Sequence, residues 1–224
     1  MSRRFHHPLP FGAELLARKR TRFRLWAPDC KAVSVLISGR KPLALRAARG
    51  GWFEGEADCG AGTRYRYRVA PERWVPDPAS RAQNGDVHGH SLVVDPRAYR
   101  WRHGDWRGRP WHEAVIYEAH VGALGGFKGV RAHLPRLKRL GVTALELMPI
   151  AEFPGARNWG YDGVLPYAPD ASYGKPEELK RLVDEAHGQG LMVLLDVVYN
   201  HFGADGNYLP VYASRFFRKD RPTT

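Results

Sequence analysis

The sequence has few cysteines and no long apolar run. Of 224 residues only two are cysteine, Cys30 and Cys59. Their spacing fits neither a metal site nor a disulfide framework, so we expect free thiols in a reducing compartment. No stretch approaches the length of a membrane-spanning helix, and the first residues lack the apolar core of a secretory signal. We therefore expect a soluble, cytoplasmic protein with no membrane partner.

Acidic residues are few relative to basic ones. The chain has 35 Lys and Arg against 23 Asp and Glu, a formal net charge of +12, and arginine supplies most of the positive charge. A basic protein can bind nucleic acid through a clustered basic patch. Here the arginines are scattered from Arg3 to Arg221, which favours ordinary surface arginine. We expect no nucleic-acid partner.

The first part of the chain, residues 1–104, alternates short apolar runs with Gly and Pro. Within the runs apolar and polar residues alternate, as Tyr65 and Tyr67 do with arginine, and no helical periodicity is present. This spacing of short strands predicts a β-sandwich with one face inward and the arginines outward. The strands are expected at residues 21–28, 32–38, 51–57, 63–69 and 91–95.

Residues 97–110, RAYRWRHGDWRGRP, separate the two parts of the chain. Interleaved arginine and aromatic residues are compatible with a single-stranded nucleic-acid surface. They are equally compatible with aromatic side chains packed between two domains, and linkers of this composition often lie at domain boundaries. We favour the second interpretation and place the boundary between 1–104 and 105–224.

After Trp111 the pattern becomes strand, helix, strand, helix, strand, which is the repeat of a parallel sheet or barrel. Leu134, Leu137 and Leu140 should face the sheet, Gly141 should end the first helix, and Pro135 should begin or kink it. Strands are predicted at 114–121, 142–150 and 191–198, the first and third of them buried, and helices at 130–141 and 175–190.

The third strand ends in DVVYNH, residues 196–201, which places polar side chains where a buried strand leaves its sheet. Asp196 should lie within the strand and needs a partner to stay charged. Chemistry in α/β folds sits at these carboxyl ends. The long loop 151–174 supplies Trp159 and Tyr161, whose rings suit the apolar face of a sugar or, equally well, a small satellite core.

Several segments resemble glycoside hydrolase family 13, the α-amylase family. LLDVVYNH and GVTALELMPI resemble its conserved strand regions, whereas NWGYDGVLPYAPDASYG and FGADGNYL look most like its trehalohydrolases, which act on malto-oligosyltrehalose. FRLWAPDCKAVSV, YRYRV and VPDPAS resemble the family 48 carbohydrate-binding module, an immunoglobulin-like sandwich. The resemblance implies such a sandwich followed by about three strands of an incomplete (β/α)8 TIM barrel.

The resemblance also implies roles for individual residues. Tyr161 matches the tyrosine that stacks on the sugar at the cleaved bond, and His201 matches the histidine that hydrogen-bonds that sugar. Trp159 is grouped with them as substrate-binding. Asp196 matches an aspartate that organises the site, and Asn200 matches an asparagine that ligates calcium in many α-amylases. Trehalohydrolases are not expected to need that ion, so no metal or cofactor is predicted.

No residue here matches the three catalytic acids of the family, which follow its fourth, fifth and seventh strands. A retaining glycosidase needs two carboxyl groups about 5–5.5 Å apart. The expectation is therefore an N-terminal fragment of an α-glucan hydrolase, inactive alone, whose sandwich folds while its open barrel half stays loose. A glycogen branching enzyme and a non-catalytic glucan-binding module are the alternatives.

Overall fold

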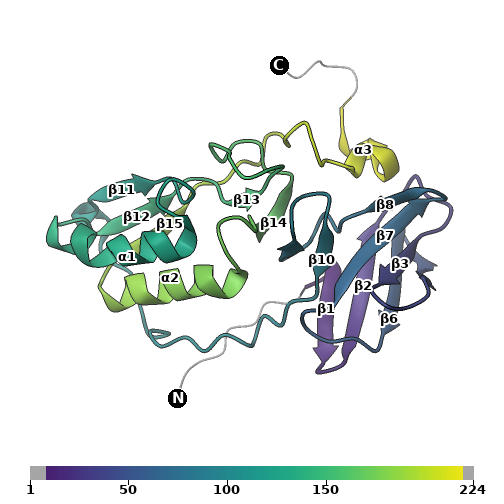
Figure 1. The fold of residues 1–224 in the computed structure, drawn as a ribbon, viewed down its shortest axis with the longest axis horizontal. Helices are drawn as coiled ribbons and strands as arrows, with labels where there is room; N and C mark the ends of the chain where they lie inside the picture. Colours follow the sequence, from purple (N-terminus) through teal and green to yellow (C-terminus); the bar gives the residue numbers. More distant parts are fainter. Residues whose placement is uncertain (1–8, 219–224) are drawn as a thin grey trace.

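A computed structural model describes residues 9–218. The chain forms a two-sheet part and a three-stranded α/β part, and an antiparallel hairpin lies between them (Figure 1). The two-sheet part holds the first ten strands, and the parallel sheet holds three strands. The order of elements along the chain follows the predicted change from short strands to alternating strands and helices.

The two-sheet part consists of antiparallel strands. In the first sheet, four strands lie in the order β1 (Gly12–Ala17), β2 (Arg20–Trp26), β6 (Trp52–Ala57) and β5 (Arg46–Ala48). The second sheet has the order β4 (Leu43–Ala44), β3 (Ser34–Ile37), β7 (Arg64–Ala70), β10 (His90–Leu92) and β9 (Gln83–Asn84), with β8 (Arg73–Val75) paired to β7. Every predicted strand of this part is present, and the structure adds five.

One apolar core joins these two sheets. Phe23 on β2 meets Tyr65 on β7 edge to face, with ring centroids 5.0 Å apart, and Tyr67 is fully buried beside them. The Tyr65 hydroxyl donates to Asp77 Oδ2 at 2.7 Å, which satisfies both buried polar groups. Period-2 alternation in β2 and β7 therefore buries the aromatic residues, as the sequence predicts.

The α/β part is built on a parallel sheet in the order β11 (Ile116–Ala119), β12 (Ala144–Leu147) and β15 (Met192–Leu195). Helices α1 (Gly126–Arg139) and α2 (Pro176–Gly188) lie together against one side of it (Figure 1). Within residues 9–218 the sheet is open, because β11 and β15 each pair with β12 alone.

The outer strands are more exposed than predicted. Only β12 is buried along most of its length, whereas Ile116, Tyr117 and Leu195 are exposed. Asp196 lies just past the end of β15 rather than inside it, and is partly exposed. The expectation that the strands at 114–121 and 191–198 are buried was wrong, because β11 and β15 each lie at an edge of the sheet and lack a neighbour on one side.

Helix α1 differs from its prediction at both ends. It begins at Gly126, so Pro135 lies inside it and does not start it. Pro135 is exposed, and the helix continues through it although proline removes one backbone hydrogen bond. Leu140 is 67% exposed, because it caps the helix instead of joining the buried stripe. Gly141 ends the helix as predicted, with φ of +85°.

The long loop after β12 is partly ordered as a hairpin. Strands β13 (Ala151–Glu152) and β14 (Leu165–Pro169) pair antiparallel, and their residues Leu165 and Ala168 are buried against Val87 of the two-sheet part. In α2, Pro176 occupies the first turn as predicted, and Lys175 N donates to Glu178 Oε2 at 3.0 Å.

The connecting segment 97–110 contains no helix or strand and lies along α2. Asp184, buried on that helix, accepts hydrogen bonds from Tyr99 Oη at 3.0 Å, Arg102 N at 3.0 Å and His103 N at 2.9 Å. These bonds to the ionised form lower the pKa of Asp184 although burial opposes them. The connection is therefore fixed to the α/β part.

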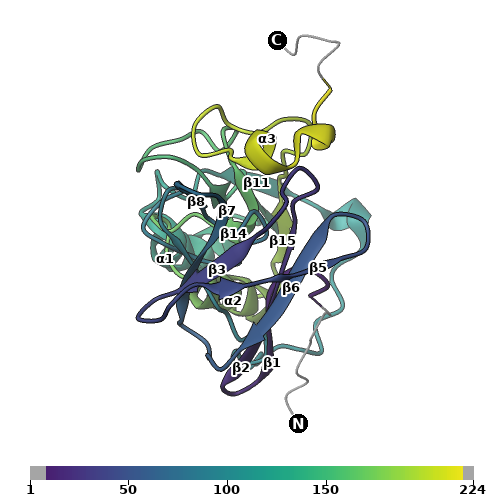
Figure 2. The same cartoon turned by 90° about the vertical axis from the view of Figure 1, so that its right-hand side faces the viewer.

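The chain returns to the two-sheet part after β15. Short helix α3 (Leu209–Tyr212) lies beside β7 and β8 (Figure 2). The Tyr212 side chain is 1% exposed and belongs to the sandwich core, and its carbonyl accepts Asp29 N at 3.2 Å. Ser214 N donates to Asp29 Oδ2 at 2.6 Å. Residues far along the chain thus complete a core that the sequence assigned to residues 1–104.

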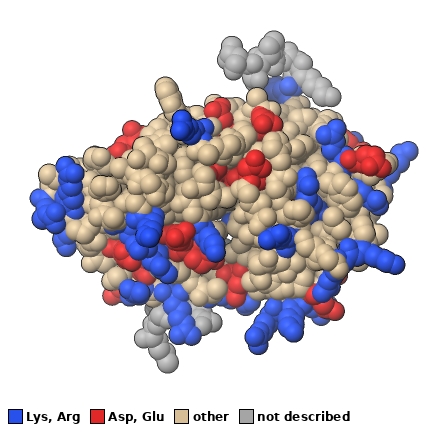
Figure 3. Space-filling model, viewed as in Figure 1, with Lys and Arg blue, Asp and Glu red and all other residues tan. Residues whose placement is uncertain are grey.

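Basic side chains are spread over the face drawn in Figure 3, with acidic ones between them. Cys30 and Cys59 are both unpaired. No helix within residues 9–218 is long and apolar enough to cross a bilayer.

Candidate functional site

Three residues predicted from the sequence come together at the carboxyl end of the parallel sheet. The Tyr161 hydroxyl donates to Asp196 Oδ2 at 3.4 Å, and His201 Nε2 donates to the Tyr161 carbonyl oxygen at 2.8 Å. The hydrogen-bond partner of Asp196, which the sequence left unidentified, is therefore Tyr161. These bonds connect the loop after β12 with the segment after β15.

The turn that presents Tyr161 is shaped by Asn158. Its side-chain oxygen accepts Gly160 N at 2.6 Å, and its amide nitrogen donates to Asp162 Oδ2 at 3.1 Å. Gly160 has φ of +107°, and a Cβ there would lie 2.7 Å from the Pro149 carbonyl. His120, after β11, bonds the Asn158 carbonyl at 2.6 Å. All three strand ends therefore contribute to one arrangement.

Trp159 extends from this turn into solvent and is 80% exposed. An exposed tryptophan beside a half-exposed Tyr161 forms no satellite core, so the alternative of a buried cluster under the loop does not hold for these two rings. Tyr173, from the same loop, does pack inward against Phe127 and Phe153. Asn200 is exposed beyond the end of β15. We call Trp159, Tyr161, Asp196 and His201 the rim.

A hollow of about 160 Å³ lies beside the rim. Asp196 and Gly160 belong to its lining, together with the exposed ring of Tyr199 and the side chain of Phe202. The surface thus offers aromatic faces next to a carboxylate and an imidazole. Such a combination fits a ligand with flat apolar faces and hydroxyl groups.

The rim is electrostatically acidic despite the basic chain. Glu118 on β11 and Glu146 on β12 are register partners below it. Partial burial, then the negative charges of Asp196 and Glu118, raise the pKa of Tyr161. The phenol therefore keeps its proton at neutral pH and remains a hydrogen-bond donor.

One buried acidic pair was missed from the sequence. Glu152 and Asp170 are each 1% exposed in the hairpin, and Ala171 N donates to Glu152 Oε2 at 2.9 Å. Burial and the neighbouring charge of Asp170 raise the pKa of Glu152 to about 9. Both acids occur in a loop-like stretch without periodicity, so no sequence pattern indicated their burial.

Metal ligation has no obvious place in this arrangement. No group of three or more His, Cys, Asp and Glu side chains within the described part of the chain is placed to hold a metal ion.

Comparison with known proteins gives the following relatives. Residues 80–220 match the family model described as alpha amylase, catalytic domain. Malto-oligosyltrehalose trehalohydrolase of Deinococcus radiodurans is 46% identical over 94% of this chain and 34% of its own length. A 1,4-alpha-glucan branching enzyme of Xanthomonas oryzae pv. oryzae is 32% identical over 84% of this chain and 29% of its own length.

Comparison with solved structures also finds an alpha amylase. A Salmonella typhimurium protein described as an alpha amylase superposes with a TM-score of 0.94 at 48% identity, over 97% of this chain and 38% of that one. The chain thus spans about a third of the length of the curated relatives it matches, 34% and 36% of two malto-oligosyltrehalose trehalohydrolases, from Deinococcus radiodurans and Saccharolobus solfataricus.

Proposed function

The chain belongs to the α-amylase family, and on that premise we propose that it is the substrate-cradling portion of a trehalohydrolase. Its three-stranded parallel sheet is then the first part of the family's (β/α)8 barrel, and its chemistry is that of an α-glucan-active glycoside hydrolase. The specific reaction proposed is hydrolysis of the α-1,4 bond next to the terminal trehalose of malto-oligosyltrehalose. The 46% identity to a malto-oligosyltrehalose trehalohydrolase supports this reaction most directly, and the contacts of Tyr161 with Asp196 and His201 support a sugar-binding site.

In this proposal each rim residue has a physical role. Tyr161 stacks on a glucose ring, and its bond to Asp196 fixes the ring plane. His201 Nε2 is engaged by the Tyr161 carbonyl, so its Nδ1 is the atom left to meet a sugar hydroxyl. Trp159 offers a second platform. These 224 residues are expected to bind the glucan without cleaving it, because none matches the family's three catalytic acids.

Further parts of the proposal concern the rest of the chain. The two-sheet part is proposed to be an immunoglobulin-like, family 48 carbohydrate-binding module spanning 1–104, with the barrel portion at 105–224. A cytoplasmic location and a role in trehalose biosynthesis are proposed as well, and the unpaired Cys30 and Cys59 are compatible with that compartment.

Two alternatives remain in view. A glycogen branching enzyme, which transfers the glucan to a sugar hydroxyl, is favoured by the 32% identity to such an enzyme. A non-catalytic glucan-binding module is favoured by the lack of matches to the catalytic acids.

The rim is tested by calorimetric titration of the purified chain with maltopentaose. Tyr161→Ala and Trp159→Ala should each weaken binding about tenfold, since an aromatic contact contributes roughly 0.5–1.5 kcal/mol beyond its buried area. Trp111→Ala is the matched control, because Trp111 is exposed in the short 3-10 helix η1 (Trp111–Glu113) before β11, at the opposite end of the sheet.

Unchanged affinity in both rim variants, or an equal loss in Trp111→Ala, would refute the role of the rim in glucan binding.

Incubation of the chain with malto-oligosyltrehalose tests the proposed reaction. Trehalose release by these 224 residues would contradict the expectation that they bind without cleaving. Appearance of new branch points in amylose would favour the branching alternative.

A further inference from the structure

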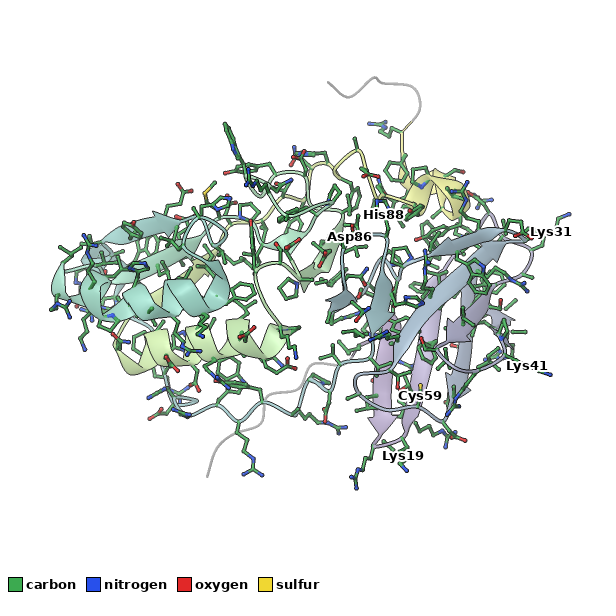
Figure 4. All side chains as sticks on the ribbon, in the orientation of Figure 1. Lys19, Lys31, Lys41, Cys59, Asp86 and His88 are labelled. Atoms are coloured by element: carbon green, nitrogen blue, oxygen red, sulfur yellow. The ribbon has the colours of Figure 1, made fainter. Side chains whose placement is uncertain are left out.

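A cavity of about 680 Å³, widely open to solvent, lies where the two parts of the molecule meet. One wall is the loop 84–89 between β9 and β10, and the other is formed by residues 152–156 and 171–172 of the hairpin region. Figure 4 shows Asp86 and His88 at this junction, near the returning C-terminal segment. None of the rim residues lines the cavity.

The loop wall is held in a fixed shape before any ligand arrives. Asp86 Oδ1 accepts His88 N at 2.9 Å, and the Asp86 carbonyl accepts Gly89 N at 2.8 Å. The His88 ring lies between Tyr208 Oη, 2.7 Å from Nδ1, and Asp205 Oδ2, 3.4 Å from Nε2. A cavity with pre-set walls loses little conformational entropy when it binds.

The lining combines hydrogen-bonding groups with apolar surface and offers little positive charge. It contains the side chains of Asn84, Asp86, His88, Glu152 and Ser172, together with glycine backbone, and no Lys or Arg. Anions are therefore not favoured there. At Gly85 and Gly155 an added Cβ would meet nothing within 4 Å, so the space above the backbone is open at both walls.

Glu152 is the buried polar group of this cavity. It is 1% exposed, and its Oε2 accepts a hydrogen bond from Ala171 N at 2.9 Å. With its pKa raised to about 9 by burial and by Asp170, the carboxyl group is neutral at physiological pH. A neutral carboxyl group both donates and accepts a hydrogen bond, which suits a hydroxyl group better than a cation.

We propose that this cavity is a second binding site, for an uncharged, hydroxyl-rich ligand of about disaccharide size. Its volume falls within the roughly 300–1,000 Å³ of small-molecule sites. Asn84 and Glu152 each provide a donor and an acceptor, and Asp86 provides an acceptor. This inference does not depend on the proposed function, since it uses no rim residue.

The test uses maltose as the probe and the Tyr161→Ala chain as the background, in which binding at the rim is weakened about tenfold. Ala156→Trp places a large ring in the exposed hairpin wall of the cavity. It should weaken maltose binding at least tenfold, whereas Ala132→Trp, on the exposed face of α1, should leave it unchanged. Amide shifts on adding maltose should map to 84–89 and 152–156.

A second variant, Asn84→Ala, distinguishes the loss of hydrogen bonds from the steric effect of Ala156→Trp. Asn84→Ala removes one donor and one acceptor at an exposed position and should weaken maltose binding about threefold to tenfold. No maltose binding in the Tyr161→Ala background, or binding equally insensitive to Ala156→Trp and Asn84→Ala, overturns the proposal. So does stronger binding of inorganic phosphate than of maltose at the same amides. Loss of rim binding alone bears only on the proposed function.

Discussion

At the scale of single residues, Glu152 stands out because its charge is suppressed by its surroundings. Burial and Asp170 raise its pKa from the ordinary 4.5 to about 9. Between these two pH values the folded chain holds a proton that the unfolded chain releases. By linkage, this group makes the protein less stable as pH rises from about 5 to 9.

Glu152→Gln should therefore remove a pH dependence. The glutamine keeps a neutral polar group in the same space, so the free energy of unfolding should match wild type near pH 5. At pH 8 the variant should be more stable than wild type by the order of a few kcal/mol. Urea denaturation at the two pH values measures this. Glu185→Gln, at a partly exposed carboxylate of α2, is the control and should show no such gain.

At the rim, the sequence indicated which residues lie near one another, but not their atomic contacts. Tyr161, Asp196 and His201 were selected by strand position and family resemblance, and the structure brings them together. Which atoms meet was not predictable, because the turn at Asn158 decides it through bonds between residues of one loop. The buried state of Glu152 was equally hidden, since only the hairpin creates it.

At the scale of elements, Pro135 is a local conflict inside α1. A proline in a helix interior removes one backbone hydrogen bond and crowds the preceding turn. The helix persists because Phe127, Val130, Leu134 and Leu137 bury one face against the sheet. Burial of the apolar face of α1 thus outweighs the low helix propensity of Pro135.

Pro135→Ala should stabilise the protein. The substitution restores the backbone donor at an exposed site, so the free energy of unfolding should rise by about 1–3 kcal/mol. Thermal and urea denaturation measure it. Arg136→Ala, also exposed on α1, should change stability by less than about 0.5 kcal/mol. A loss of stability in Pro135→Ala would show that the proline is needed.

Element prediction was most accurate where periodicity was strong. Helix α2 and strands β2 and β7 follow their sequence patterns closely. Strand β1 was missed because GAELLA begins with small residues and lacks β-branched ones. The exposed edge at β15 agrees with the open barrel portion expected from the sequence, although the apolar run of this strand has the composition of a covered strand.

At the scale of the whole molecule, the two-sheet part depends on residues beyond its own stretch of sequence. Tyr212 fills its core with 1% exposure, together with Ala213. The expectation that residues 1–104 form a self-sufficient sandwich therefore leaves out part of the core. Sequence periodicity could not reveal this, since a short segment 208–213 has no pattern of its own.

Tyr212→Ala should destabilise the two-sheet part strongly. Removing a buried aromatic ring of this size costs about 3–5 kcal/mol, by loss of burial and by the cavity left behind. Val211→Ala is the matched neighbour, because Val211 is 49% exposed, and it should cost less than about 1 kcal/mol. Limited proteolysis should show faster cleavage within residues 9–95 only in Tyr212→Ala. Equal effects of both substitutions would contradict the role of Tyr212.

The path of the chain has a mechanical consequence. The chain leaves the sandwich along residues 97–110, which are hydrogen-bonded to Asp184 on α2. After β15 it returns to the sandwich, where the Tyr212 side chain is buried in the core. The two-sheet part and the α/β part are therefore held together at two places, one along residues 97–110 and the other at Tyr212. A single nick in the connecting segment would leave two pieces that still migrate as one particle until a denaturant separates them.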